Sequence, residues 1–178
     1  MRTTLAIVAL VVAGSAGTAA ADDDLALMAT GGWMMPRGGF GEAYGGGAEA
    51  RMIDDNLMIG FGARALVGRA PAERRRDLMD VDFNVSVVLC DRCKSMAPYV
   101  GVGLDVLHIT THEPTRSVRG STLGLSGHAG LVGTFGDVGD RDWMWRAGVQ
   151  YLGAIVPGTG EDLGGVTLSI AVGAHIMD

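Results

Sequence analysis

Two cysteines lie close enough together in the sequence to do chemistry as a pair. Cys90 and Cys93 are separated by two residues, a spacing that can be redox-active or can supply half of a zinc site. The sequence has no second pair of this spacing and no nearby pair of histidines, and it lacks a thioredoxin-like strand–helix–strand pattern. We therefore predict a structural disulfide, formed in an oxidising compartment, and neither a metal site nor a cofactor.

Histidines and serines between positions 108 and 121 form a second candidate group. His108 and His112 would share one face of a strand about 13 Å apart, too far for one metal ion. A serine bonded to a histidine could act as a nucleophile toward an acyl ester, and Ser117 and Ser121 follow closely. No motif links these four residues, so the simplest interpretation is that they are polar residues without a catalytic role.

Charged residues within strand-like segments form the third group. Four carboxylates and three arginines fall on the polar face of these segments, so they could neutralise one another if that face were buried. The predicted network consists of Glu49, Arg51, Arg64, Asp80, Asp82, Asp105 and Arg146.

The elements that would position these charges show a simple alternation. In residues 79–89, MDVDFNVSVVL, every second residue is apolar, and most of the others are polar. Alternate side chains of a strand lie on opposite faces, so the segment predicts a strand with one apolar and one polar face. Similar runs, separated by turn residues, predict eight strands. We expect them at about 25–34, 43–53, 57–67, 78–90, 98–109, 121–135, 143–155 and 165–177.

Glycine indicates which face points inward. The chain contains 29 glycines, and many of those within the strands, such as Gly60, Gly62, Gly101 and Gly103, fall on the polar face. Glycine is unfavourable in a strand unless a small residue is needed. The lumen of an eight-stranded barrel creates that need, because side chains fill it. We therefore predict that the polar face lines a lumen and that the apolar face points toward lipid.

The predicted connections alternate in length, as in outer-membrane barrels with short periplasmic turns. The longer connections, 68–77 and 110–120, are rich in arginine, which pairs well with phosphate, so we predict contact with lipopolysaccharide. Aromatic belts are expected near both ends of the strands, with Tyr99 in the periplasmic one. The predicted contact residues are Arg69, Arg74, Arg75, Arg76, Arg116 and Arg119.

The first 21 residues have the features of a secretory signal peptide. Arg2 precedes an apolar stretch at 5–13 that is too short to span a bilayer, and small residues lead up to Ala21. We predict cleavage after Ala21 and a single domain over 22–178. The chain is acidic, with 14 Lys and Arg against 20 Asp and Glu, which disfavours nucleic-acid binding.

The sequence combines this leader and the alternating strands with phrases such as APYVGVGLDV (97–106) and WMWRAGVQYLG (143–153). In these features it resembles the small outer-membrane β-barrel proteins of Gram-negative bacteria, typified by the transmembrane domain of outer-membrane protein A. The resemblance implies an all-β, eight-stranded antiparallel up-and-down transmembrane barrel, inserted by the outer-membrane assembly machinery. We expect the protein to be a monomer. Members usually end the last strand on an aromatic residue, whereas this chain ends AHIMD.

The expected function is a structural or surface-interaction role in the outer membrane, with a polar, plugged lumen and no catalysis. One alternative is a lipid A-modifying enzyme, which needs a Ser–His pair at the outer rim. A second is a narrow solute pore, which the charged lumen disfavours. A third is a soluble periplasmic binder like a lipocalin, which would need the apolar face inside.

Overall fold

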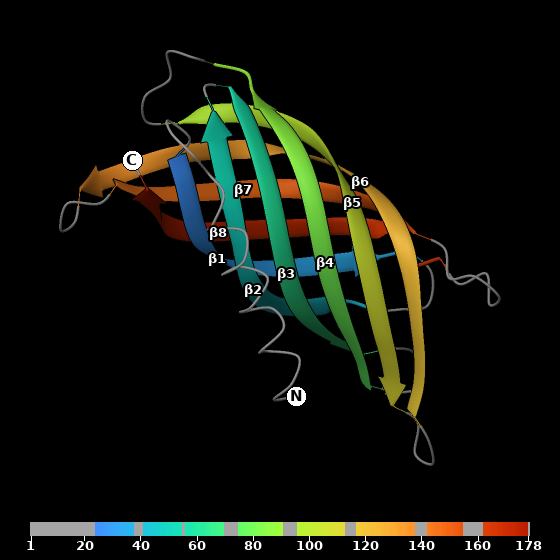
Figure 1. Cartoon of the computed structure of the whole chain (residues 1–178). Helices are drawn as coiled ribbons and strands as arrows, with labels where there is room; N and C mark the ends of the chain where they lie inside the picture. Colours follow the sequence, from blue (N-terminus) through green and yellow to red (C-terminus); the bar gives the residue numbers. More distant parts are fainter. Residues whose placement is uncertain are drawn as a thin grey trace.

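The fold is a closed barrel of eight antiparallel strands, as the sequence predicts (Figure 1). The computed structural model describes residues 24–37, 41–54, 56–69, 75–90, 96–112, 117–137, 142–154 and 162–177. Each strand pairs with the next in the chain, and β8 also pairs with β1, which closes the barrel. The strands are β1 Asp24–Pro36, β2 Ala43–Asp54, β3 Leu57–Arg69, β4 Arg75–Val88, β5 Ala97–His112, β6 Ser117–Asp137, β7 Asp142–Ala154 and β8 Gly165–Met177. None of the residues in these ranges belongs to a helix long and apolar enough to cross a membrane.

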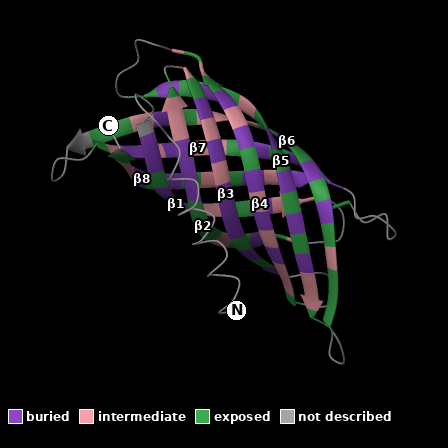
Figure 2. Cartoon of the chain, in the orientation of Figure 1, coloured by how far each residue is buried: buried purple, intermediate pink, exposed green. Residues whose placement is uncertain are grey.

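Side chains alternate between the inside and the outside of the barrel (Figure 2). In β5, Tyr99, Asp105 and Leu107 are buried, whereas Val102 and Leu104 between them are 68% and 55% exposed. The same alternation runs along β4, where the buried positions include two aspartates. The structure thus places the polar face inside and the apolar face outside, which is the arrangement predicted from the glycines.

The two ends of the barrel differ. We call one end the turn end; it carries the first residues of β1, the last residues of β8 and the connections β2–β3, β4–β5 and β6–β7. We call the other end the extended end; it carries the connections β1–β2, β3–β4, β5–β6 and β7–β8. The predicted long connections, 68–77 and 110–120, are wrong, because β3 to β6 continue through most of these residues and leave only 70–74 and 113–116 between strands. In Figure 1, the β5–β6 hairpin accordingly projects past β7 at the lower right.

The lumen has three layers. Apolar side chains fill the extended end and pack as one cluster; a second apolar cluster fills the turn end; charged residues lie between them. The polar lumen expected from the sequence therefore describes only the middle layer, and the two apolar layers differ from that expectation. The extended-end cluster contains Met34, Ala43, Leu66, Leu78, Leu107, Ile109, Leu152, Ala154 and Leu163, and the turn-end cluster contains Ala26, Met28, Met58, Ala97, Tyr99, Val132, Met144 and Ala171.

Candidate functional site

Part of the predicted charged network gathers around one carboxylate, and we call it the Glu49 group: Glu49, Arg51, Arg146 and Tyr99. Arg146 of β7 donates from Nε and Nη2 to the two Glu49 oxygens at 3.0 and 2.7 Å. Arg51 donates from Nε to Glu49 Oε1 at 3.1 Å, and Arg146 Nη1 donates to the Tyr99 hydroxyl at 2.8 Å. All four side chains are buried, so one carboxylate is neutralised by two guanidinium groups.

The remaining charges form the aspartate group, which consists of Asp80, Asp82, Asp105 and Arg64. Arg64 of β3 is the register partner of Asp80 on β4, and its Nη2 donates to Asp80 Oδ2. The same nitrogen lies 3.9 Å from Asp82 Oδ1. Asp105 of β5 is the register partner of Asp82 and is fully buried. This part of the lumen therefore holds three carboxylates and one arginine, which contacts two of them.

Neutral side chains form hydrogen bonds with these charged groups, and the predicted network does not include them. Gln150 accepts from Arg64 Nη2 at 2.8 Å and donates from Nε2 to Asp105 Oδ1 at 2.8 Å. Asn84 donates to Asp82 Oδ2 at 2.6 Å. Both residues lie in the inward phase of their strands, so the alternation alone could have added them.

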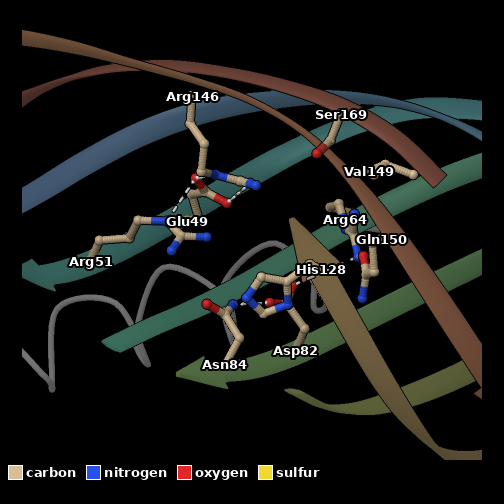
Figure 3. Close-up of a pocket in the computed structure, with 10 residues that line it drawn as sticks. All are labelled: Glu49, Arg51, Arg64, Asp82, Asn84, His128, Arg146, Val149, Gln150 and Ser169. Carbon is tan, nitrogen blue, oxygen red and sulfur yellow. Dashed lines mark hydrogen bonds and ion pairs between the residues drawn. The ribbon is translucent and has the colours of Figure 1, made fainter. Parts of the chain in front are cut away.

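A small polar cavity lies between the two groups (Figure 3). Its volume is about 20 Å³, and carboxylate, guanidinium, amide and imidazole groups line it. Such a space holds about one water molecule. The arrangement can bind water and hold charges in place, and within the described ranges no group of three or more His, Cys, Asp or Glu residues is arranged to hold a metal ion.

Inward glycines make room for this network. A Cβ atom added to Gly62 would lie 2.5 Å from Asp82 Oδ1, closer than real Cβ atoms approach. At Gly148 the added carbon would overlap the Tyr99 hydroxyl that receives the Arg146 bond. Glycine therefore leaves room inside the barrel for a polar side chain from another strand, Asp82 of β4 at Gly62 and Tyr99 of β5 at Gly148.

Tyr99 corrects one sequence expectation. Its position near a strand end predicts a place in an interfacial aromatic belt, but Tyr99 is 1% exposed and its ring points into the lumen beside His128, with ring centroids 6.0 Å apart. Tyr99 shares the inward phase of β5 with Asp105, so the alternation pattern predicts its direction better than its position near a strand end does.

The arginines predicted to lie in outer loops are placed differently. Arg69 ends β3, Arg75 and Arg76 begin β4, and Arg119 lies in β6, so the predicted loop location is wrong for these four. The strands extend past the point where their apolar residues end, which is why the loops were overestimated. Arg75 is exposed and donates to Asp77 at 2.9 Å. Arg74 and Arg116 lie outside the described residues.

The histidines and serines of the sequence analysis do meet, on the outer face of the extended end. His108 Nδ1 lies 2.8 Å from Ser121 Oγ. Two outward positions further along β5, beyond Thr110, His112 Nδ1 lies 3.3 Å from Ser117 Oγ, and its Nε2 lies 3.0 Å from Asp77 Oδ2. All five side chains lie at or near the surface.

The predicted disulfide involves a residue outside the described ranges. Cys90 follows β4 and packs against the turn-end apolar cluster, but Cys93 lies in 91–95. The Cys90–Cys93 bond therefore stays a prediction, as does the leader peptide, because residues 1–23 are not described either.

A closed eight-stranded barrel with charges inside and apolar side chains outside has the architecture of small outer-membrane β-barrel proteins. No family model and no curated protein matches the sequence. Among solved structures, Neisserial surface protein A matches with a TM-score of 0.62 at 12% identity, over 85% of this chain and 94% of that one. The N-terminal β-barrel domain of Pseudomonas aeruginosa OprF matches with a TM-score of 0.58 at 17% identity, over 85% and 96%.

A third similar structure is the attachment invasion locus protein Ail of Yersinia pestis, in complex with the heparin analogue sucrose octasulfate. Its TM-score is 0.55 at 13% identity, over 85% of this chain and 96% of that one. At these identities the likenesses establish the fold alone, and that fold is the outer-membrane β-barrel expected from the sequence.

Proposed function

We propose that this protein is a monomeric outer-membrane barrel with a structural or surface-interaction role, no catalytic activity and a closed lumen. The observation that carries the proposal is the inverted polarity of the wall. Val102, Leu123 and Leu125 are 68%, 73% and 69% exposed on the outside, whereas seven charged residues are buried inside. A contiguous apolar surface of this kind requires lipid rather than water around it.

Closure of the lumen is supported by its three layers. An ion crossing the barrel would pass two packed apolar clusters and the ion pairs between them. Breaking buried ion pairs is costly, and the cavity between them holds about one water molecule. A solute pore would need these side chains to rearrange.

The extended end is proposed to face outward. There the strands continue past their apolar residues into positions such as Asp77, Thr110 and Arg119. Arg75, Arg76 and Arg119 would then lie near the phosphates of lipopolysaccharide, to which arginine binds well. The outer-membrane assembly machinery would be the partner during insertion, after removal of residues 1–21 on export.

Membrane fractionation with gel migration before and after boiling tests the proposal. A folded outer-membrane barrel is expected in the outer-membrane fraction, resistant to detergent and shifted in migration only after heating. Recovery in the soluble periplasmic fraction, without a heat-dependent shift, would contradict it.

A matched pair of variants tests the lipid-facing wall. Val102→Arg places a charge in the apolar band of β5 and should destabilise a membrane barrel by roughly 2–4 kcal/mol, whereas Thr110→Arg, beyond that band, should cost at most about 1 kcal/mol. In a soluble barrel both changes would be surface substitutions within about 0.5 kcal/mol. Equal, small effects would therefore show that this wall faces water and would contradict the proposal.

A second candidate function, lipid ester hydrolysis, rests on the Ser117–His112–Asp77 chain and the His108–Ser121 pair. A serine bonded to a histidine that is oriented by a carboxylate is the arrangement of a nucleophilic triad. Here the ring nitrogens are used in the reverse order, with Nδ1 toward serine, and His112 and Asp77 are 43% and 37% exposed, which weakens the case. Covalent labelling by a fluorophosphonate that is abolished in Ser117→Ala or Ser121→Ala would establish this function; equal absence of labelling in all three proteins would exclude it.

A further inference from the structure

A groove marks the outer wall where β6 and β7 separate. The last register pair between these strands at the extended end is Gly124 with Ala154, whereas β6 continues along β5 to Ser117. Figure 1 shows β6 running past the right-hand end of β7. The groove at this point has a volume of about 590 Å³, within the range typical of small-molecule sites.

The floor of the groove is apolar and exposed. Leu104, Leu123, Leu125 and Tyr151 line it, and each is at least 43% exposed. Gly153 lies among them, and a Cβ atom added there would meet only the Leu125 carbonyl oxygen, at 3.8 Å. A missing side chain between leucines on a lipid-facing wall leaves a channel in which a hydrocarbon chain can lie.

One arginine stands at the polar rim of this channel. Arg37 follows β1, and its guanidinium carbon lies 4.9 Å from the centre of the Tyr151 ring. The Arg37 backbone N–H donates to the Gly164 carbonyl at 2.5 Å, which anchors its segment to the residues before β8. Asp162 also lines the groove, and its Oδ1 accepts from the Gly164 N–H at 2.7 Å.

We propose that this groove is a binding site for one phosphorylated lipid of the outer leaflet. One acyl chain lies over Gly153 between Leu125 and Tyr151, and Arg37 binds the phosphate. Charge complementarity selects this occupant, because a guanidinium at the end of an apolar channel matches a phosphate attached to a hydrocarbon chain. The inference rests on the proposed function, since such a lipid is present only if this wall faces a membrane.

The site is distinct from the rim arginines of β4. Arg75 lies on the outer face across β5 from β6 and is held by Asp77. It therefore supplies a matched control for the headgroup contact. Gly31 of β1 supplies a matched control for the channel, because it also lies on the outer wall and an added Cβ atom would meet only the Gly45 carbonyl oxygen, at 3.9 Å.

Native mass spectrometry of the protein in a non-ionic detergent tests the site, with phosphatidic acid as the probe. Retention of one phosphatidic acid is expected, with no comparable retention of diacylglycerol with the same chains or of inorganic phosphate. Arg37→Gln should weaken retention about tenfold, as for the loss of one charge-assisted hydrogen bond. Gly153→Leu should fill the channel and abolish retention, whereas Arg75→Gln and Gly31→Leu should retain the lipid like the unmodified protein.

Equal retention by all five proteins, or retention of diacylglycerol as strong as that of phosphatidic acid, would overturn the inference. Gel migration before and after boiling is measured on the same samples. A heat-dependent shift in every variant shows that each is folded, so a loss of lipid then reports on the groove. Absence of the shift in the unmodified protein would instead contradict the proposed function itself.

Discussion

The two halves of the charged lumen differ in how well their buried carboxylates are neutralised. In the Glu49 group, one carboxylate accepts hydrogen bonds from two arginines through both of its oxygens. In the aspartate group, Asp80 and Asp82 lie against Arg64, and Asp105 is linked to the same arginine only through Gln150. Among the described residues, Asp80 Oδ1 and Asp105 Oδ2 are buried without a hydrogen-bond partner. The comparison indicates that one half of the network has reserve positive charge and the other half depends on a single side chain.

Loss of Arg64 should therefore have the largest effect. Arg64→Met keeps an unbranched side chain but leaves three buried carboxylates without a cation, and we expect the barrel to lose roughly 3–5 kcal/mol of unfolding free energy. Urea titration of the barrel in lipid vesicles, followed by gel migration, measures it. A loss below about 1 kcal/mol would mean that the aspartates are neutralised in some other way.

Loss of Arg146 should cost less. Arg146→Met removes the bonds to Glu49 and to the Tyr99 hydroxyl, but Arg51 continues to donate to Glu49. We expect a loss of roughly 1–3 kcal/mol, the cost of leaving buried polar groups unsatisfied. The same titration applies, and a loss larger than that of Arg64→Met would reverse the comparison between the two groups.

Replacing Gly62, which lies beside the aspartate group, should lower the free energy of unfolding for steric reasons. Gly62→Ala brings a methyl group against Asp82, and we expect a loss of about 1–3 kcal/mol from overpacking. Gly127→Ala is the matched control, because Gly127 points outward and an added Cβ atom meets nothing within 4 Å. Equal effects of the two substitutions in the urea titration would show that the lumen is less tightly packed than described.

Neutralising one aspartate should have the smallest effect. Asp105→Asn keeps the shape and an acceptor for Gln150 while removing one of the two negative charges that face each other across β4 and β5. Because relief of like-charge repulsion offsets any lost attraction to Arg64, we expect a change within about 1 kcal/mol, of either sign. A loss comparable to that of Arg64→Met would show that Asp105 is paired more strongly than its contacts suggest.

The sequence predicted the faces of the strands better than the contacts between them. Alternation placed Asp80, Asp82 and Asp105 inside because the two-residue period depends only on local sequence. Alternation could not predict the pairing of Glu49 with Arg146, which are 97 residues apart. These residues meet because β8 pairs with β1, which places β2 and β7 across the lumen from each other.

Two other sequence predictions differ from the structure because a rule based on local sequence conflicts with strand pairing or with packing in the lumen. Charge usually marks a loop, so the sequence predicts a loop at Arg75 and Arg76, but cross-strand pairing with β3 and β5 keeps both residues in a strand. Leu66, Leu78 and Leu107 occupy the inward phase and form the apolar layer at the extended end. Alternation along the strands indicates that these leucines point inward, but a lumen expected to be polar leaves no place for an apolar layer.

Single-channel recording of the unmodified protein in planar bilayers tests the central claim, that packed apolar layers and paired charges close the lumen. Insertion is confirmed separately by gel migration of the recovered protein. We expect no steady conductance step from the unmodified protein and small currents from Arg64→Met, because loss of the arginine loosens the network. A stable open channel of porin size in the unmodified protein would contradict the closed lumen and favour the solute-pore alternative.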